Sequence, residues 1–206
     1  MVTLPTPVPA IEIALFSQGM SKGLRQTDGA QFLVRPEIAE GPVFLGGYFK
    51  NITATNADGE AAVLVGLRGH VQGFGLSANV EFKWNTGTRG PLDRQALELN
   101  AAVERHFGRI TPRVSLTWSP DDLGGTRASL YAEGGVTVGP FAGFSFGGAV
   151  ARRSRAGNPD YTAFNAGMSY AFARHFSVDL RFYDTDRSAL GTIYRGRLVA
   201  AARMRF

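Results

Sequence analysis

The chain of 206 residues contains no cysteine, so it has neither a disulfide framework nor a thiolate that could bind metal or act as a nucleophile. Long apolar runs are also missing. The longest, around residues 61–67, is far shorter than the roughly 18 residues that a transmembrane helix needs. No Ser-rich, Pro-rich or single-sign charge tract divides the sequence, which favours one domain. Residues 1–9 lack the basic and apolar segments of a signal peptide, and we expect that a leader has been removed.

Apolar residues are instead spread at every second position over segments of about 9 to 12 residues, the length of a tilted membrane-crossing β-strand. Over residues 76–84, apolar side chains alternate with Ser77, Asn79, Glu81 and Lys83. The same alternation recurs over residues 113–118 and 176–182. This pattern predicts an all-β protein whose strands have one apolar and one polar face.

The connections between these segments alternate between short turns and longer polar loops. Short periplasmic turns opposite longer extracellular loops are typical of outer-membrane barrels. Five turns and six loops predict an up-and-down antiparallel barrel of twelve strands. The predicted turns are Gly41-Pro42, Gly73-Phe74, Gly108-Arg109, Gly139-Pro140 and residues 172–175. The predicted loops are residues 25–30, 53–59, 86–93, 120–126, 153–160 and 187–192.

A soluble β-sandwich is the alternative, because it also has alternating strands separated by turns. A sandwich does not require long and short connections to segregate by end, or aromatic residues to collect at strand ends. Here the aromatic residues do collect, as in the two girdles of a membrane barrel. Trp84 and Trp118 lie at predicted loop-side ends. The turn-side group is Phe44, Phe74, Phe107, Phe141, Phe172, Phe176 and Phe206.

The last strand, predicted over residues 193–206, alternates apolar and arginine side chains and ends in Phe206. An unpaired edge in hydrocarbon would leave backbone groups unsatisfied, so we expect this strand to pair with a first strand near residues 11–17. Glu12 would then meet Arg203 across the closure. The predicted organisation is a periplasmic segment over residues 1–10 and one transmembrane barrel domain over residues 11–206.

Short motifs along the chain resemble the TorF-type family of small proteobacterial outer-membrane proteins. Residues 22–28 (KGLRQTD), after Ser17, are similar to an Arg-Gly and Gln-Thr-Asp pattern near the first loop of that family. Residues 46–52, 118–121 (WSPD) and 183–186 (YDTD) resemble later family segments. Lys22 replaces the usual arginine, and Gly19-Met20 replace aromatic residues. The resemblance implies a barrel in the bacterial outer membrane and supplies no catalytic residues.

Charges on the polar strand faces are the most informative functional feature. A barrel of twelve strands lies between small filled barrels and porins with a water channel, so its interior can either conduct or be filled. Unpaired arginines would select small anions, whereas arginines paired with carboxylates would narrow the bore. We therefore expect a narrow passive channel for small solutes with a weak preference for anions. The alternative is a non-conducting structural or lipopolysaccharide-interacting barrel whose lumen is filled by side chains. The predicted lumen-lining residues are Glu12, Arg35, Glu37, Arg68, Glu81, Lys83, Glu98, Glu104, Arg113, Glu133, Asp179, Arg181, Arg195, Arg197 and Arg203.

No enzymatic site is expected. His70, His106 and His175 fall at turn-side strand ends, away from the outer-leaflet position that a lipid-hydrolysing Ser-His pair requires. The spacing of Asp121 and Asp122 does not fit an EF-hand-type calcium loop, so both are expected to be solvated. We expect neither a cofactor nor a metal.

The net charge of +5 favours an anionic partner. The basic residues are scattered around the loop-side rim beside membrane-level aromatics, which favours membrane lipids and lipopolysaccharide over nucleic acid. Arg152, Arg153 and Arg155 are the predicted lipid-phosphate-binding residues. We also expect the protein to be a monomer and to have a small solute as its substrate.

Overall fold

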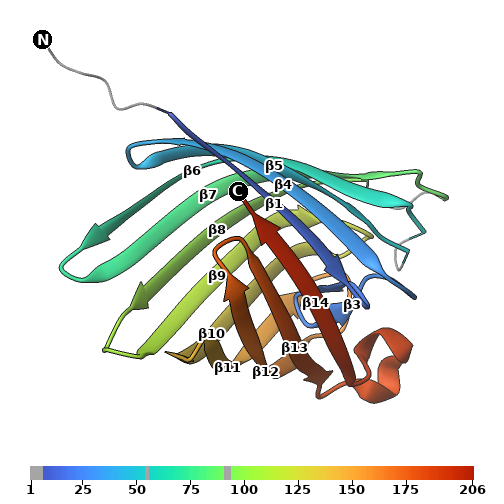
Figure 1. Cartoon of the computed structure of the whole chain (residues 1–206). Helices are drawn as coiled ribbons and strands as arrows, with labels where there is room; N and C mark the ends of the chain where they lie inside the picture. Colours follow the sequence, from blue (N-terminus) through green and yellow to red (C-terminus); the bar gives the residue numbers. More distant parts are fainter. Residues whose placement is uncertain (1–6, 54–55, 91–93) are drawn as a thin grey trace, which may run out of the picture.

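The computed structural model describes residues 7–53, 56–90 and 94–206, and within these ranges twelve antiparallel strands close into one barrel. Figure 1 shows the strands in sequence colours around the barrel wall. Each strand pairs with its neighbours in the chain, and β1 pairs with β14 to complete the ring. The predicted fold and strand count are confirmed for these residues, and a sandwich of two open sheets is excluded. The wall strands are β1 Val8–Phe16, β4 Gln31–Glu40, β5 Val43–Asn51, β6 Gly59–Val71, β7 Phe74–Thr86, β8 Gln95–Arg105, β9 Ile110–Asp122, β10 Arg127–Phe141, β11 Phe144–Arg155, β12 Tyr161–Ala173, β13 Phe176–Thr185 and β14 Arg197–Arg205.

Four further elements lie in the loops. A two-stranded hairpin of β2 Met20–Ser21 and β3 Leu24–Arg25 belongs to the loop between β1 and β4. Two short 3-10 helices, η1 Ser188–Leu190 and η2 Thr192–Tyr194, lie in the loop between β13 and β14. No helix in the described residues is long and apolar enough to cross a membrane.

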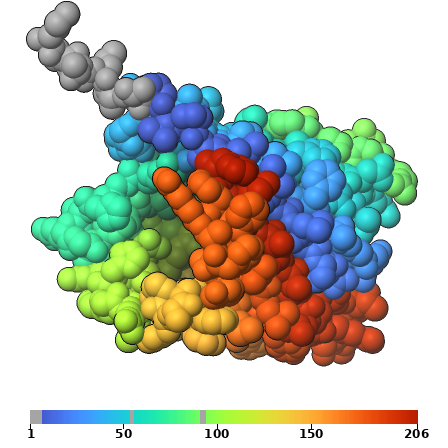
Figure 2. All heavy atoms as spheres, in the orientation of Figure 1, coloured from blue at the N-terminus to red at the C-terminus, as the bar shows by residue number. Residues whose placement is uncertain are grey.

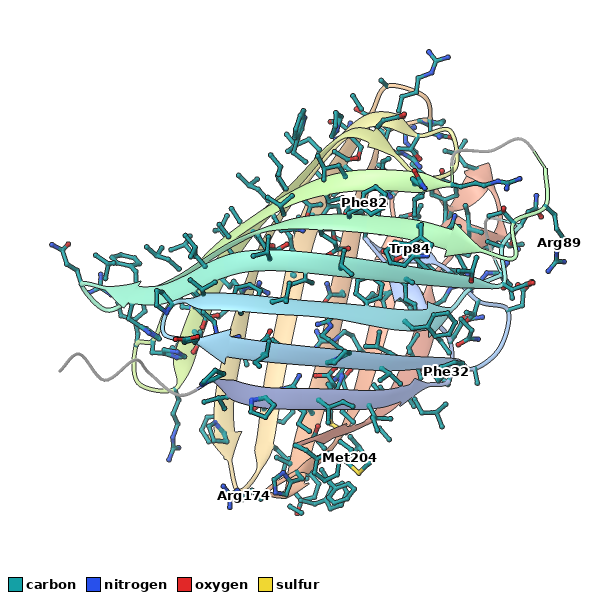
Figure 3. The ribbon with its side chains drawn as sticks, turned by 90° about the horizontal axis from the view of Figure 1, so that it is seen from above. Phe32, Phe82, Trp84, Arg89, Arg174 and Met204 are labelled. Atoms are coloured by element: carbon teal, nitrogen blue, oxygen red, sulfur yellow. The ribbon has the colours of Figure 1, made fainter. Side chains whose placement is uncertain are left out.

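Apolar side chains cover the outside of the wall. Leu97 and Leu99 are 40% and 41% exposed, whereas Glu98 between them is 5% exposed. Large apolar residues with similar exposure occur on all of the wall strands, far more than a water-soluble surface carries. Figure 3 shows Phe32, Phe82 and Trp84 toward the loop end of the barrel. The strand faces are therefore inverted relative to a soluble protein, with apolar residues outside and polar residues inside.

Three sequence expectations about this wall are wrong in detail. Phe44 does not belong to the turn-side girdle, because it lies on the inward face of β5, is 6% exposed and packs under the Arg68 guanidinium. A turn was predicted at Gly139-Pro140, but these residues lie within β10, where its register with β11 shifts. The turn itself lies at residues 142–143, both of which have positive φ. The first strand begins at Val8, inside the predicted terminal segment, of which residues 1–6 lie outside the described part.

The closure of the barrel follows the predicted strand pair with a different ion pair. Glu12 lies opposite Arg205 in the register of β1 and β14, and the Arg205 Nε donates to Glu12 Oε2 over 2.5 Å. Arg203 lies opposite Ala14 instead, with its guanidinium over the Phe16 ring. The prediction was wrong by one inward-facing position, because sequence alternation defines a face and not the register between strands.

Candidate functional site

The first loop-side connection folds into the barrel instead of extending from it. We call residues 20–25, which form β2, a turn and β3, the inner hairpin (Figure 1). Its turn consists of Lys22 at φ 49° and Gly23 at φ 81°, the positive values that a tight hairpin turn requires. A Cβ atom at Gly23 would lie 2.4 Å from the Ala163 Cβ, on the inner face of β12. Only glycine fits this close approach to the wall.

The Lys22 side chain ends in a buried cluster of charged groups on the opposite wall. Its Nζ donates to Glu98 on β8 and, over 3.0 Å, to Asp122 Oδ2 at the end of β9. Lys83 on β7 contacts the same two carboxylates, and Arg153 on β11 bonds Asp122 over 2.5 Å. We call Lys22, Lys83, Glu98, Asp122 and Arg153 the latch cluster. It holds three cations and two carboxylates, and it ties the inner hairpin to four wall strands.

Electrostatics in the latch cluster act on Lys22 in both directions. Burial, followed by the nearby Lys83 charge, lowers the pKa of Lys22, whereas Glu98 and Asp122 oppose this shift. A charged ammonium in this setting depends on both carboxylates for its stability.

Apolar and aromatic contacts hold the other side of the inner hairpin. Leu24 packs in a buried cluster with Ala151, Ala163, Tyr161 and Tyr194. The Tyr161 hydroxyl donates to the Lys22 carbonyl over 2.5 Å, and its ring meets the Tyr194 ring edge-on at 5.8 Å. Tyr194 comes from η2, so the last loop also packs on the first. The inner hairpin is therefore clamped between two sides of the wall.

A second polar network fills the lumen beside β4 to β7. The Tyr48 hydroxyl bonds Glu60 over 2.7 Å and Glu81 over 2.9 Å, while Lys50 pairs with Glu60 over 3.0 Å. The Arg35 guanidinium lies over the Tyr48 ring. These side chains fill the lumen on the β4 to β7 side, so the lumen is more open on the β9 to β13 side.

Three cavities follow one another through the lumen. A turn-side cavity of about 600 Å³ is lined by β6 to β9, and Figure 2 shows a hollow between the turns at this end. A middle cavity of about 400 Å³ is lined by β9 to β13 and the inner hairpin, and a loop-side cavity of about 250 Å³ lies beyond it. Arg113 lines the first two cavities, and Ser21 and Lys22 line the last two. The inner hairpin thus separates the two sides of the lumen.

This arrangement matches known membrane channels in fold. The KdgM porin superposes with a TM-score of 0.67 at 9% identity, covering 96% of this chain and 99% of that protein. The NanC porin gives a TM-score of 0.61 at 9% identity, with 95% and 97% covered. The COG4313 outer membrane channel from Pseudomonas putida F1 gives 0.56 at 13% identity, with 100% and 97% covered. The chain has an outer-membrane porin fold. No family model matches the sequence, and no curated protein matches it.

Within the porin fold, the predicted lumen-lining residues lie on the inward strand faces, with one exception. Arg195 follows η2 and is exposed before β14 begins, because the last strand starts at Arg197 and not near residue 193. Several inward charges are paired: Arg68 with Glu37 over 2.7 Å, and Arg181 with Asp179 over 3.5 Å. The lumen therefore combines neutralised pairs with free basic groups.

The predicted lipid-phosphate-binding residues separate onto two faces of β11. Arg152 faces outward and is half exposed, 3.3 Å from Asp160. Arg153 is buried in the latch cluster, and the Arg155 guanidinium lies inside over the Tyr161 and Tyr194 rings. The prediction was wrong for Arg153 and Arg155, because alternate residues of a strand point to opposite faces. Contact of the outer surface with lipopolysaccharide stays a prediction.

Sequence reasoning also missed the role of two loop residues. Asp122 was expected to be solvated, yet it is 2% exposed and accepts from Lys22, Arg153 and Ser129. Lys22, at the start of the first loop segment, lies among buried carboxylates and not with the basic residues of the loop-side rim. An apolar Leu24 within an otherwise polar loop was the available signal that this segment is buried. The described residues contain no group of His, Asp and Glu side chains that could hold a metal ion.

Proposed function

We propose that this protein is a narrow passive channel of the bacterial outer membrane for small solutes, with a weak preference for anions. The observation that supports this proposal is the series of three lumen cavities, in which neighbouring cavities share Arg113 or the hairpin residues Ser21 and Lys22 as lining. Polar walls and a constriction of this kind admit small hydrated solutes and exclude large ones. The similarity to porins in fold agrees with this function.

Charge on the route supports the anion preference. Arg113 borders two cavities, and no carboxylate among the described residues lies within ion-pair distance of it. Arg35 and Arg203 contact aromatic rings instead of carboxylates. Guanidinium groups that face water in a lumen attract anions and repel cations.

Single-channel recording in planar bilayers tests the proposal. We expect a small unitary conductance and, across a salt gradient, a reversal potential that indicates anion preference. Arg113→Glu should reduce or reverse this preference, whereas Arg174→Glu, at the turn end of the barrel (Figure 3), should leave it nearly unchanged. Conductance that never exceeds the background of empty bilayers would refute the channel.

A structural, non-conducting barrel is the second candidate, and the inner hairpin is the observation that favours it. A hairpin that never leaves the wall would keep the loop-side and middle cavities apart. We also propose that the chain is a monomeric member of the TorF-type family, on the support of the motifs around residues 22–28, 118–121 and 183–186. Chemical cross-linking in detergent tests the monomer.

A further inference from the structure

The loop-side cavity contains an unusual concentration of unsatisfied hydrogen-bonding atoms. Four buried side-chain polar atoms in the described part of the chain have no partner: the Nε atoms of Arg25, Arg153 and Arg155, and Oδ1 of Asn85. All four residues line this one cavity of about 250 Å³. A buried polar group without a partner costs about 1–3 kcal/mol, so such groups are rare unless water, an ion or a ligand satisfies them.

The charges around the cavity are not balanced. Six cations line it or pair with its lining, against four carboxylates, and the excess is positive. The cations are Lys22, Arg25, Lys50, Lys83, Arg153 and Arg155. The carboxylates are Asp28, Glu60, Glu98 and Asp122.

Arg155 is the cation that has no carboxylate partner among the described residues. Its Nη2 donates to the Pro159 carbonyl and, over 2.9 Å, to the Tyr194 hydroxyl. Its guanidinium is 4.8 Å from the centre of the Tyr161 ring. These three contacts fix the orientation of the guanidinium and leave its charge uncompensated, which preorganises it for an anion.

We propose that the loop-side cavity binds a small oxyanion, such as phosphate or a small carboxylate, with Arg155 as the principal contact. Guanidinium N–H groups match the oxygens of phosphates and carboxylates in geometry and charge. A water molecule takes up about 30 Å³ of liquid volume, so the cavity has room for an oxyanion with part of its hydration.

The physiological role of this site rests on the proposed channel function. An anion that enters the lumen from the loop side would be held in this cavity, next to Lys22. Binding itself does not depend on conduction. It can be measured by isothermal titration calorimetry on the full chain in detergent, with inorganic phosphate as the probe and sulfate as a second oxyanion.

We expect saturable phosphate binding that Arg155→Gln weakens about ten-fold or more, the equivalent of losing one charge-assisted hydrogen bond. Arg152→Gln is the matched control, since it removes the same charge from an outward-facing position of β11, three residues before Arg155, and should leave affinity nearly unchanged. Arg155→Lys keeps the charge but not the planar donors, and should give an intermediate affinity. It also keeps the test valid if Arg155→Gln does not fold, as judged by heat-dependent gel mobility.

Equal phosphate affinity in the wild type, Arg155→Gln and Arg155→Lys would overturn the proposal, as would the absence of saturable binding. A parallel titration with lipopolysaccharide separates a lipid phosphate from the free ion: binding of lipopolysaccharide alone would refute a free-oxyanion site. Phosphate binding without bilayer conductance would refute the channel and leave this site standing.

Discussion

Replacing Lys22 with methionine should release the inner hairpin from the wall while preserving the barrel. The side chain keeps most of its apolar length and loses the ammonium that bonds Glu98 and Asp122. The remaining latch cluster is then neutral, with Lys83 and Arg153 facing the two carboxylates. Neither carboxylate becomes unpaired, so the substitution should weaken the binding of the hairpin to the wall and not the stability of the wall itself.

The magnitude follows from the contacts that are lost. Removing one partner of a buried ion pair costs about 3–5 kcal/mol when the other charge is left unpaired. Both carboxylates keep a partner here, so we expect about 2 kcal/mol, within the range for hydrogen bonds to charged groups. This corresponds to an increase of about 30-fold in the ratio of released to bound hairpin.

Single-channel recording should show this increase as more frequent or longer open events in Lys22→Met than in the wild type. Lys83→Met is the matched control, because it removes a lysine from the same carboxylates but from the wall and not from the hairpin. Tyr161→Phe loses the hydrogen bond to the Lys22 carbonyl and the one that its hydroxyl accepts from Arg153 Nη1, and we expect it to cost the bound hairpin less than Lys22→Met does, about 1 kcal/mol. Trypsin cleavage after Arg25, identified by mass, gives a readout that is independent of conduction. Identical open probabilities and cleavage rates in Lys22→Met and Lys83→Met would refute the latch.

Three further changes test other parts of the structure. Gly23→Ala should release the inner hairpin as Lys22→Met does, because the added Cβ would collide with Ala163 and the backbone φ is +81°. Trypsin cleavage after Arg25 measures the release. A bond after Arg25 that stays protected from trypsin would contradict the prediction. Leu180→Arg, on the lipid face of β13, should lower the free energy of unfolding in urea by about 2–4 kcal/mol, with the inward-facing Ser169→Arg expected to cost less. Glu12→Gln should change stability by less than about 1 kcal/mol, because its partner Arg205 is 72% exposed; a larger loss in the same titration would mean that this ion pair controls closure.

The wall of the barrel was readable from the sequence because each strand repeats one simple rule. Alternation over residues 76–84 assigns the two faces of β7 without knowledge of any other strand. The spacing of polar loops and tight turns then orders the strands by neighbour pairing alone. Register was less accessible, and Glu12 pairs with Arg205 and not with Arg203, because alternation is unchanged when a strand slides by two residues.

The candidate site was not readable in the same way. The chain places about a hundred residues between Lys22 and Asp122, and about forty more between Asp122 and Tyr161. These residues meet only because the barrel curves around the first loop. A polar loop that projects into water and one that folds into a polar lumen have the same composition, since both environments satisfy charged side chains. This limit applies to Arg153 and Arg155. Their residue type indicated an anionic partner, but only the structure showed that both side chains lie inside the barrel.

Local patterning of apolar and polar residues therefore determined the barrel, its strand number and its inverted faces, because these depend on contacts between neighbouring strands. The tertiary structure alone decided that the inner hairpin occupies the lumen and that the latch cluster holds it there. Those contacts join β7, β8, β9 and β11 to one loop, and closing the ring of strands is what brings them within hydrogen-bonding distance.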